Sequence, residues 1–187
     1  MVSGYKLLFW GLILAHVNIT VGFFTVFPAF VGYLIFLCGY YDIEAETKKR
    51  RYLIPRICTA LLVLLTIILP FMEHFLNLDV YSTLIYQYYQ SILMLLEFTT
   101  VHYVFVMGIN GLERRQLDEV AEKFVRKDKV FLWLMGLGIC GVTIGVTANT
   151  NYFQIVGLVG NMLAFIAGVM ILFTLSDFRT TFLENET

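Results

Sequence analysis

Residues 129–148 read KVFLWLMGLGICGVTIGVTA, a run that carries no charge after its first residue. About 20 apolar residues in a helix are enough to cross the ~30 Å hydrocarbon core of a bilayer. Similar runs recur along the whole 187-residue chain. We identify six candidate spans, at residues 6–22, 27–42, 52–72, 80–109, 129–148 and 153–176.

The composition agrees with this interpretation. Hydrophobic residues make up 59% of the chain and charged residues 14%, whereas soluble domains carry about 25% charge. This excess excludes a disordered chain, a coiled coil and a disulfide-stapled secreted module. The net charge of −1 provides no field that would attract nucleic acid. The sequence therefore predicts an all-α integral membrane protein, with residues 1–187 forming one transmembrane helical domain.

Basic residues lie on one side of the predicted spans. The connections at about 23–26, 73–79 and 149–152 carry none. All 13 bases lie before, between or just inside the other ends: Lys6; Lys48, Lys49, Arg50, Arg51 and Arg56; Arg114, Arg115, Lys123, Arg126, Lys127 and Lys129; Arg179. Because cytoplasmic loops are enriched in Lys and Arg, we expect a multi-pass plasma-membrane protein with both termini in the cytoplasm.

The first two spans are short, and Asn18, Gly22 and Pro28 interrupt them. Two arrangements fit this pattern. Either two short helices form a tight hairpin, or the pair enters the membrane and returns as a re-entrant element, which must be buried in protein or line water. Both arrangements leave the rest of the topology unchanged.

A short cytoplasmic amphipathic helix is expected at about 112–127. Its apolar residues recur at helical spacing, and its other face is charged. The stripe consists of Leu117, Val120, Ala121, Phe124 and Val125. This helix would lie on the headgroups or cap the bundle. Arg114, Arg115 and Lys123 are candidate docking residues for a cytoplasmic partner.

Glycines predict where the last two spans pack. Gly141 and Gly145 form a GxxxG pair in span 129–148, and Gly157 and Gly160 lie in span 153–176. Small residues let membrane helices approach closely. We expect these two spans to pack on each other, in preference to forming a dimer interface.

The N-terminal segment carries a further pattern. It reads Lys6-Leu-Leu-Phe-Trp10-Gly11, then Asn18-Ile19, then Phe27-Pro28-Ala29-Phe30-Val-Gly32-Tyr33 and Gly39. This pattern resembles the opening of small uncharacterised multispanning proteins of Gram-positive bacteria, over about 37 of the 187 residues. The resemblance implies a bacterial plasma membrane and no known activity. Those proteins have an acid after the proline, where this chain has Ala29, which argues against a polar site at that turn.

Polar side chains inside the spans are costly, and therefore mark candidate sites. Glu97 is the clearest, and Gln90 and Thr100 share its helix face. The full candidate set is Glu97, Gln90, Thr100, His16, His102 and Asn161. Glu97 is either a proton or cation site or a protonated structural carboxyl. His16 and Glu97 fall at compatible depths for a pair between helices.

Metal and cofactor sites are not expected. His16 and His102 lack metal-ligand spacing, and as core residues they would simply be hydrogen-bonded. A bis-histidine haem would need both rings at one depth and facing each other, so haem is not the favoured interpretation. Cys38, Cys58 and Cys140 all fall inside spans without a CxxC pair, which indicates apolar thiols rather than a zinc site or disulfides.

Three function classes remain. The first is a non-catalytic subunit that binds, assembles or regulates a membrane or cytoplasmic partner, or a second copy of the chain. The second is a small transporter with a proton- or cation-coupled site at Glu97. The third is an intramembrane redox enzyme. Because the sequence contains no catalytic motif for hydrolysis, nucleotide binding or metal-dependent proteolysis, we expect no enzyme and favour the first class.

Overall fold

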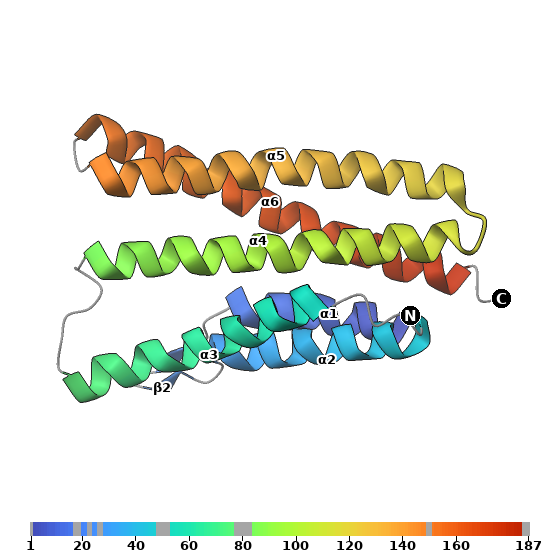
Figure 1. Cartoon of the computed structure of the whole chain (residues 1–187), viewed down its shortest axis with the longest axis horizontal. Coiled ribbons are helices and arrows are strands. Elements are labelled where there is room, and N and C mark those ends of the chain that lie inside the picture. The colour runs from blue at the N-terminus through green and yellow to red at the C-terminus, as the bar shows by residue number, and fades with distance from the viewer. Residues whose placement is uncertain are drawn as a thin grey trace. The chain divides into compact units, whose positions relative to one another are not determined.

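The regular elements that the computed structural model describes are helices, apart from one very short ladder (Figure 1). The structure describes the backbone of residues 2–16, 20–21, 24–25, 28–47, 53–76, 84–148 and 151–184, and the side chains of 2–16, 28–45, 53–68, 88–145 and 154–184. In these residues the helices are α1 (Val2–His16), α2 (Ala29–Thr47), α3 (Leu53–Leu76), α4 (Leu84–Glu113), α5 (Asp118–Ala148) and α6 (Asn151–Glu184). Asn18, Gly22 and the basic residues 48–51 lie outside the described part of the chain.

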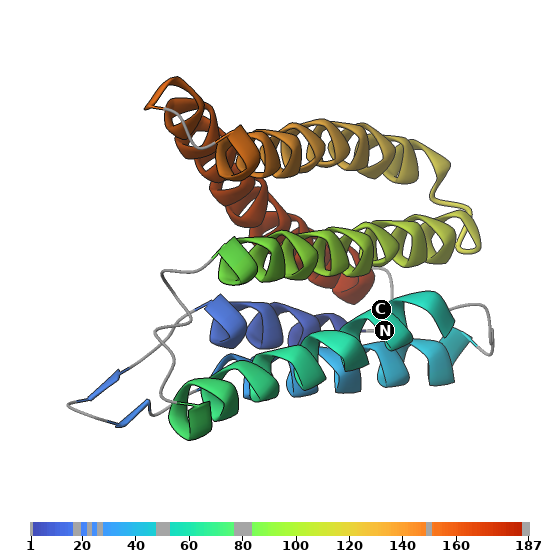
Figure 2. The same cartoon turned by 60° about the vertical axis from the view of Figure 1, so that its left-hand side comes forward.

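The ladder joins two strands of two residues each. β1 (Thr20–Val21) pairs antiparallel with β2 (Phe24–Thr25), with Thr20 opposite Thr25. Both strands belong to the connection between α1 and α2 (Figure 2). The connection therefore folds back locally before α2 begins.

One expected boundary is wrong. No separate amphipathic helix covers 112–127, because α4 continues to Glu113 and α5 runs unbroken from Asp118 to Ala148. Asn110 lies inside α4, and its Nδ2 donates to the Val106 carbonyl at 2.6 Å within the helix. The first part of α5 contains no glycine or proline that would break it, so the charged segment and the apolar segment form one helix.

Chain packing divides the molecule into two compact units. One comprises Met1–Ile68 together with Leu172–Thr187, and the other comprises Leu69–Ile171. α6 therefore contributes its first part to the second unit and its last part to the first.

In the first unit, α1 and α2 pack as an antiparallel pair with glycines at the contact. A Cβ atom on Gly11 would lie 2.6 Å from the Phe36 nitrogen, and one on Gly39 would lie 2.9 Å from the Gly4 carbonyl oxygen. A Cβ on Gly32 would overlap the backbone of Ala15. The two backbones are thus too close for any larger residue at these positions.

The end of α6 completes this unit. The ring of Tyr5 stacks on the rings of Phe178 and Phe182, with centroids 5.2 Å and 5.4 Å apart. All three side chains are fully buried. The first turn of α1 and the last turns of α6 therefore lie together.

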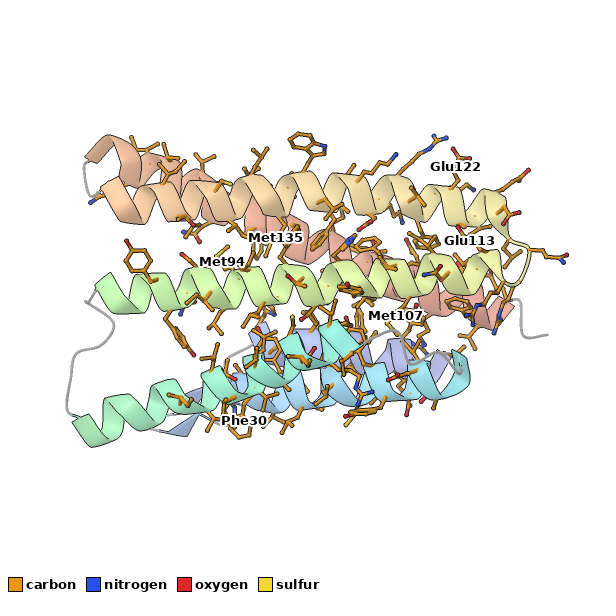
Figure 3. The ribbon with its side chains drawn as sticks, in the orientation of Figure 1. Phe30, Met94, Met107, Glu113, Glu122 and Met135 are labelled. Atoms are coloured by element: carbon orange, nitrogen blue, oxygen red, sulfur yellow. The ribbon has the colours of Figure 1, made fainter. Side chains whose placement is uncertain are left out.

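In the second unit, α4 and α5 run side by side as an antiparallel hairpin (Figures 1 and 2). The turn between them spans residues 114–117, and Gln116 adopts a left-handed conformation with φ 61°. The amide of Leu117 donates to the Leu112 carbonyl at 3.1 Å, which closes the end of α4. Glu113 and Glu122 mark this end of the hairpin in Figure 3.

The same unit joins α5 to the first part of α6 through glycines. A Cβ on Gly160 would lie 2.6 Å from the Val142 nitrogen, and one on Gly138 would lie 3.0 Å from the Gly160 oxygen. Like the α1–α2 contact, this contact depends on glycines, whose lack of a side chain lets the two backbones approach.

Three helices are long and apolar enough to cross a membrane. In the described residues these segments are Tyr88–Glu113, Asp118–Gly145 and Gln154–Glu184, and Leu53–Ile68 is a shorter apolar helix. Large apolar side chains on these helices are exposed, among them Trp133 at 71% and Phe165 at 73%. A helical membrane protein, whose outer surface meets lipid, accounts for such exposure.

Candidate functional site

The clearest polar contact within the α4–α5 hairpin joins His102 to Asp128. The His102 Nδ1 and an Asp128 carboxylate oxygen are 2.9 Å apart. The Asp128 side chain is 12% exposed and that of His102 is 31% exposed. His102 lies about 11 residues before the end of α4 and Asp128 about 10 after the start of α5, which places both ~16 Å from the turn.

Aromatic rings flank this pair. The Phe131 ring lies 5.9 Å from the Phe98 ring and 5.5 Å from the Phe105 ring, centroid to centroid. Phe98 and Phe105 precede and follow His102 on α4, and Phe131 follows Asp128 by one turn on α5. The pair therefore interacts in apolar surroundings, where a hydrogen bond between charged or polar groups is stronger than in water.

The pair can hold and exchange a proton. Because an ionised Asp128 only accepts, the His102 Nδ1–H donates to it, and Nε2 then remains to gain or lose a proton. A metal centre needs more ligands than this. In the described residues no group of three or more His, Cys, Asp or Glu side chains lies close enough to hold an ion.

The predicted polar stripe of α4 is present as a helix face, with different degrees of burial. Thr100 is 1% exposed, and its hydroxyl donates to the Leu96 carbonyl at 2.8 Å. Glu97 and Gln90 are half-buried. Thr100 thus uses its hydroxyl at least in part within its own helix, while Glu97 stays a candidate for a proton or cation.

His16 and Asn161 are both exposed. The His16 Nδ1–H donates to the Leu12 carbonyl at 2.9 Å, at the end of α1. His16 belongs to the first unit, and Glu97 to the second, so a pair between them stays a prediction. Asn161 lies on the part of α6 that belongs to the second unit.

The four glycines predicted for helix packing lie between α5 and α6. A Cβ on Gly141 would lie 3.0 Å from the Gly160 Cα, and one on Gly157 would lie 3.3 Å from the Gly145 Cα. These residues bring the two backbones together.

The predicted docking residues lie at the turn end of the hairpin. Arg114 is exposed and Arg115 half-buried within the turn, and Lys123 is exposed on α5. Near Lys123 on the same helix, an Arg126 nitrogen donates to a Glu122 oxygen at 2.8 Å, and both side chains are mostly exposed. This end of the hairpin therefore presents a mixed-charge surface.

Asp128 was missed by sequence reasoning, because it stands within the basic run from Arg126 to Lys129 and looks like part of a solvated face. Spacing could have found it. The buried positions of α5 recur at intervals of three and four residues, and they include Ala121, Phe124, Asp128, Phe131, Met135, Gly138 and Val142. Asp128 occupies a core position in that series.

A second missed contact lies in the first unit. Arg56 of α3 donates from Nη1 to a Glu44 oxygen at 2.7 Å and from Nη2 to the Tyr41 hydroxyl at 2.9 Å, both on α2. Its guanidinium carbon also lies 4.3 Å from the centre of the Tyr41 ring. Arg56 therefore ties α3 to α2.

The three cysteines are free thiols, with Cys38 and Cys140 exposed and Cys58 half-buried.

Comparisons with protein-family models, curated proteins and solved structures found no match to this chain.

Proposed function

We propose that the chain is a non-catalytic membrane subunit that binds a cytoplasmic or membrane protein partner through the turn end of the α4–α5 hairpin. The lengths of the two helices carry this proposal. α4 has 30 residues and α5 has 31, so each is ~45 Å long, which exceeds the ~30 Å hydrocarbon core. The hairpin therefore extends about 15 Å beyond the core as two paired helices.

The charge on α5 favours the turn end as the part that extends. Asp118, Glu119, Glu122, Lys123 and Arg126 are exposed there, whereas the rest of α5 is apolar from Val130 onward. A paired, charged projection can present Arg114, Arg115 and Lys123 to a partner with little loss of backbone freedom on binding. The mixed charge favours a protein partner over a surface of one sign.

The proposed topology has six membrane helices with both termini in the cytoplasm of a bacterial cell. The stacking of Tyr5 on Phe178 and Phe182 supports it, since the start of α1 and the end of α6 then lie on one side. The distribution of Lys and Arg favours the cytoplasmic side for these ends. α1 has 15 residues, about 22 Å, so its crossing requires a locally thin bilayer.

The test is the mass of the complex released gently from its native membrane. We expect a companion protein to be released together with the unchanged chain. This companion should be absent when Arg114, Arg115 and Lys123 are all replaced by Glu. Arg179→Glu is the matched control, because it reverses an exposed charge on α6 outside the proposed surface. A companion retained by the triple variant, or a bare chain from the native membrane, would contradict the proposal.

A second candidate function is proton-coupled transport. The pair of His102 and Asp128 favours it, because a histidine and an acid between two membrane helices can take up and release a proton. Glu97, five residues before His102 on α4, would be the coupling carboxyl.

A further inference from the structure

One exposed ridge of α5 changes its chemistry abruptly. Glu122, Arg126, Lys129, Trp133 and Leu137 follow one another at intervals of three or four residues, and all five are exposed. The ridge is charged up to Lys129 and apolar from Trp133 onward. This change marks a level at which the surroundings of the helix change.

The length of the apolar part identifies that level. From Val130 to Ala148 the helix rises about 28 Å, close to the ~30 Å of a bilayer core. Lys129 then lies at the level of the headgroups, and Trp133 follows one turn deeper and is 71% exposed. Tryptophan is enriched at the boundary between headgroups and hydrocarbon, where its ring nitrogen reaches polar groups.

The acid at this level is turned away from the ridge. Asp128 adjoins Lys129 in sequence, yet its carboxylate faces His102 at 2.9 Å and its side chain is 12% exposed. Arg126 contacts Glu122, but their side chains are 76% and 67% exposed, and an ion pair in water is weak. The ridge therefore presents Arg126 and Lys129 on the two turns before Trp133, with the exposed Glu122 carboxylate beside them on the side of the hairpin turn.

We propose that Arg126 and Lys129 bind the phosphate of an anionic phospholipid whose acyl chains lie along the apolar ridge of α5 beside Trp133. Arg offers several donors in a plane that fits phosphate oxygens, and Lys adds a second positive charge. The charge of the two bases is complementary to an anionic headgroup, and the apolar ridge that continues past Trp133 suits its chains. This site is independent of partner binding at the turn.

The chain has only two tryptophans, which allows a local test. A Trp10→Phe chain, reconstituted in vesicles, leaves Trp133 as the reporter. Phosphatidylglycerol or phosphatidylcholine brominated on the acyl chains is then introduced at the same mole fraction, and quenching of Trp133 is measured. Because each base near a membrane surface attracts anionic lipid by about fivefold, we expect the two bases together to enrich the anionic lipid up to ~25-fold beside Trp133.

Lys129→Gln and Arg126→Gln should each reduce this enrichment severalfold, and the double variant should bring the two lipids to equal quenching. Lys127→Gln is the matched control. It removes the same charge from the same turn, but the Lys127 ammonium lies 5.3 Å from the centre of the Phe124 ring, away from the ridge. If both lipids quench Trp133 equally when Arg126 and Lys129 are unchanged, the proposal of a lipid site is wrong.

Two other outcomes also count against the proposal. If neither lipid quenches Trp133, the ring lies outside the bilayer. If Lys127→Gln removes the preference as fully as Lys129→Gln, the attraction belongs to the whole basic turn rather than to the ridge. Each result leaves the partner test at Arg114, Arg115 and Lys123 unaffected, so the two proposals can fail separately. Far-ultraviolet circular dichroism checks that each variant remains helical.

Discussion

Asp128 is an acid among bases in the sequence, and its partner is an imidazole on another helix. The hydrogen bond involves a charged group in apolar surroundings, which makes it more costly to remove than an exposed ion pair. On α5, the pair of Glu122 and Arg126 is such an exposed contact. The two acids are only six residues apart and differ chiefly in burial.

We therefore expect Asp128→Asn to lower the free energy of unfolding by about 1–3 kcal/mol, because it removes the charge that the imidazole of His102 contacts. His102→Gln should have a cost of the same order, and the double variant should cost less than the sum. Glu122→Gln is the matched control and should change stability by less than ~0.5 kcal/mol. Denaturation in mixed micelles measures all four. Additive losses would show that the two side chains do not interact.

Glu97 decides between the two candidate functions. If the chain is a transporter, Glu97→Gln should abolish proton flux in vesicles while expression and stability stay normal, because the amide cannot carry the proton. Loss of folding in this variant would instead identify a structural carboxyl. Vesicles in which neither the unchanged chain nor the variant moves protons would exclude the proton-coupled mechanism.

At the scale of helices, two pairs are held together by glycine. Gly11 and Gly32 let α1 and α2 approach to backbone contact, and Gly160 does the same for α6 against α5. Close approach gains van der Waals contact along the helices, the main source of attraction between helices in lipid. These contacts are therefore sensitive to the smallest addition.

Gly32→Ala should separate α1 from α2, because its Cβ would overlap the backbone of Ala15 and neither backbone can give way locally. We expect a loss of several kcal/mol, at the upper end of what overpacking costs, or ~3 kcal/mol. Gly136→Ala and Gly168→Ala are the controls, since a Cβ at either meets nothing within 4 Å. They should be neutral or slightly stabilising, as alanine favours a helix. Thermal unfolding in detergent compares the three, and an unaffected Gly32→Ala would refute the close packing.

Helix positions were largely predictable from the sequence, because long apolar runs can fold in lipid only as helices. The contact of Gly141 and Gly145 with Gly157 and Gly160 follows from the spacing of small residues. The α1–α2 contact carried the same kind of signal, since Gly4 and Gly11, like Gly32 and Gly39, are seven residues apart and share a face.

The polar contacts were less predictable. Periodicity gives the face of a helix but not its neighbour, so His102 could be identified as a candidate without its partner. The burial of Asp128 was not predicted, because its charge alone suggested exposure to solvent. Only its place in the series of buried positions on α5 distinguishes it from the exposed charged residues nearby. The continuity of α5 from its charged part into its apolar part was not predicted, because the change from charged to apolar residues after Lys129 suggested a boundary between two helices.

At the scale of the whole molecule, the proposed orientation can be mapped directly. With Cys38, Cys58 and Cys140 replaced by serine, a new cysteine is introduced at Ser3, Gln116 or Thr150 in turn. Because both termini and the basic turn are proposed to be cytoplasmic, an impermeant maleimide should label only Thr150→Cys on intact cells. Permeabilised cells provide the control, in which all three should react. Labelling of Ser3→Cys from outside would reverse the orientation.

The stacking of Tyr5 on Phe178 and Phe182 also sets an order of events in time. Ribosomes add about 5–20 residues per second, so the residues that cover Tyr5 emerge on the order of 10 s after it. During that interval α1 can pair with α2 through their glycines, but the two α6 rings that stack on Tyr5 are not yet present. This unit is therefore completed only when the last helix emerges, and a ribosome that stalls before α6 leaves the Tyr5 side of α1 without its stacking partners.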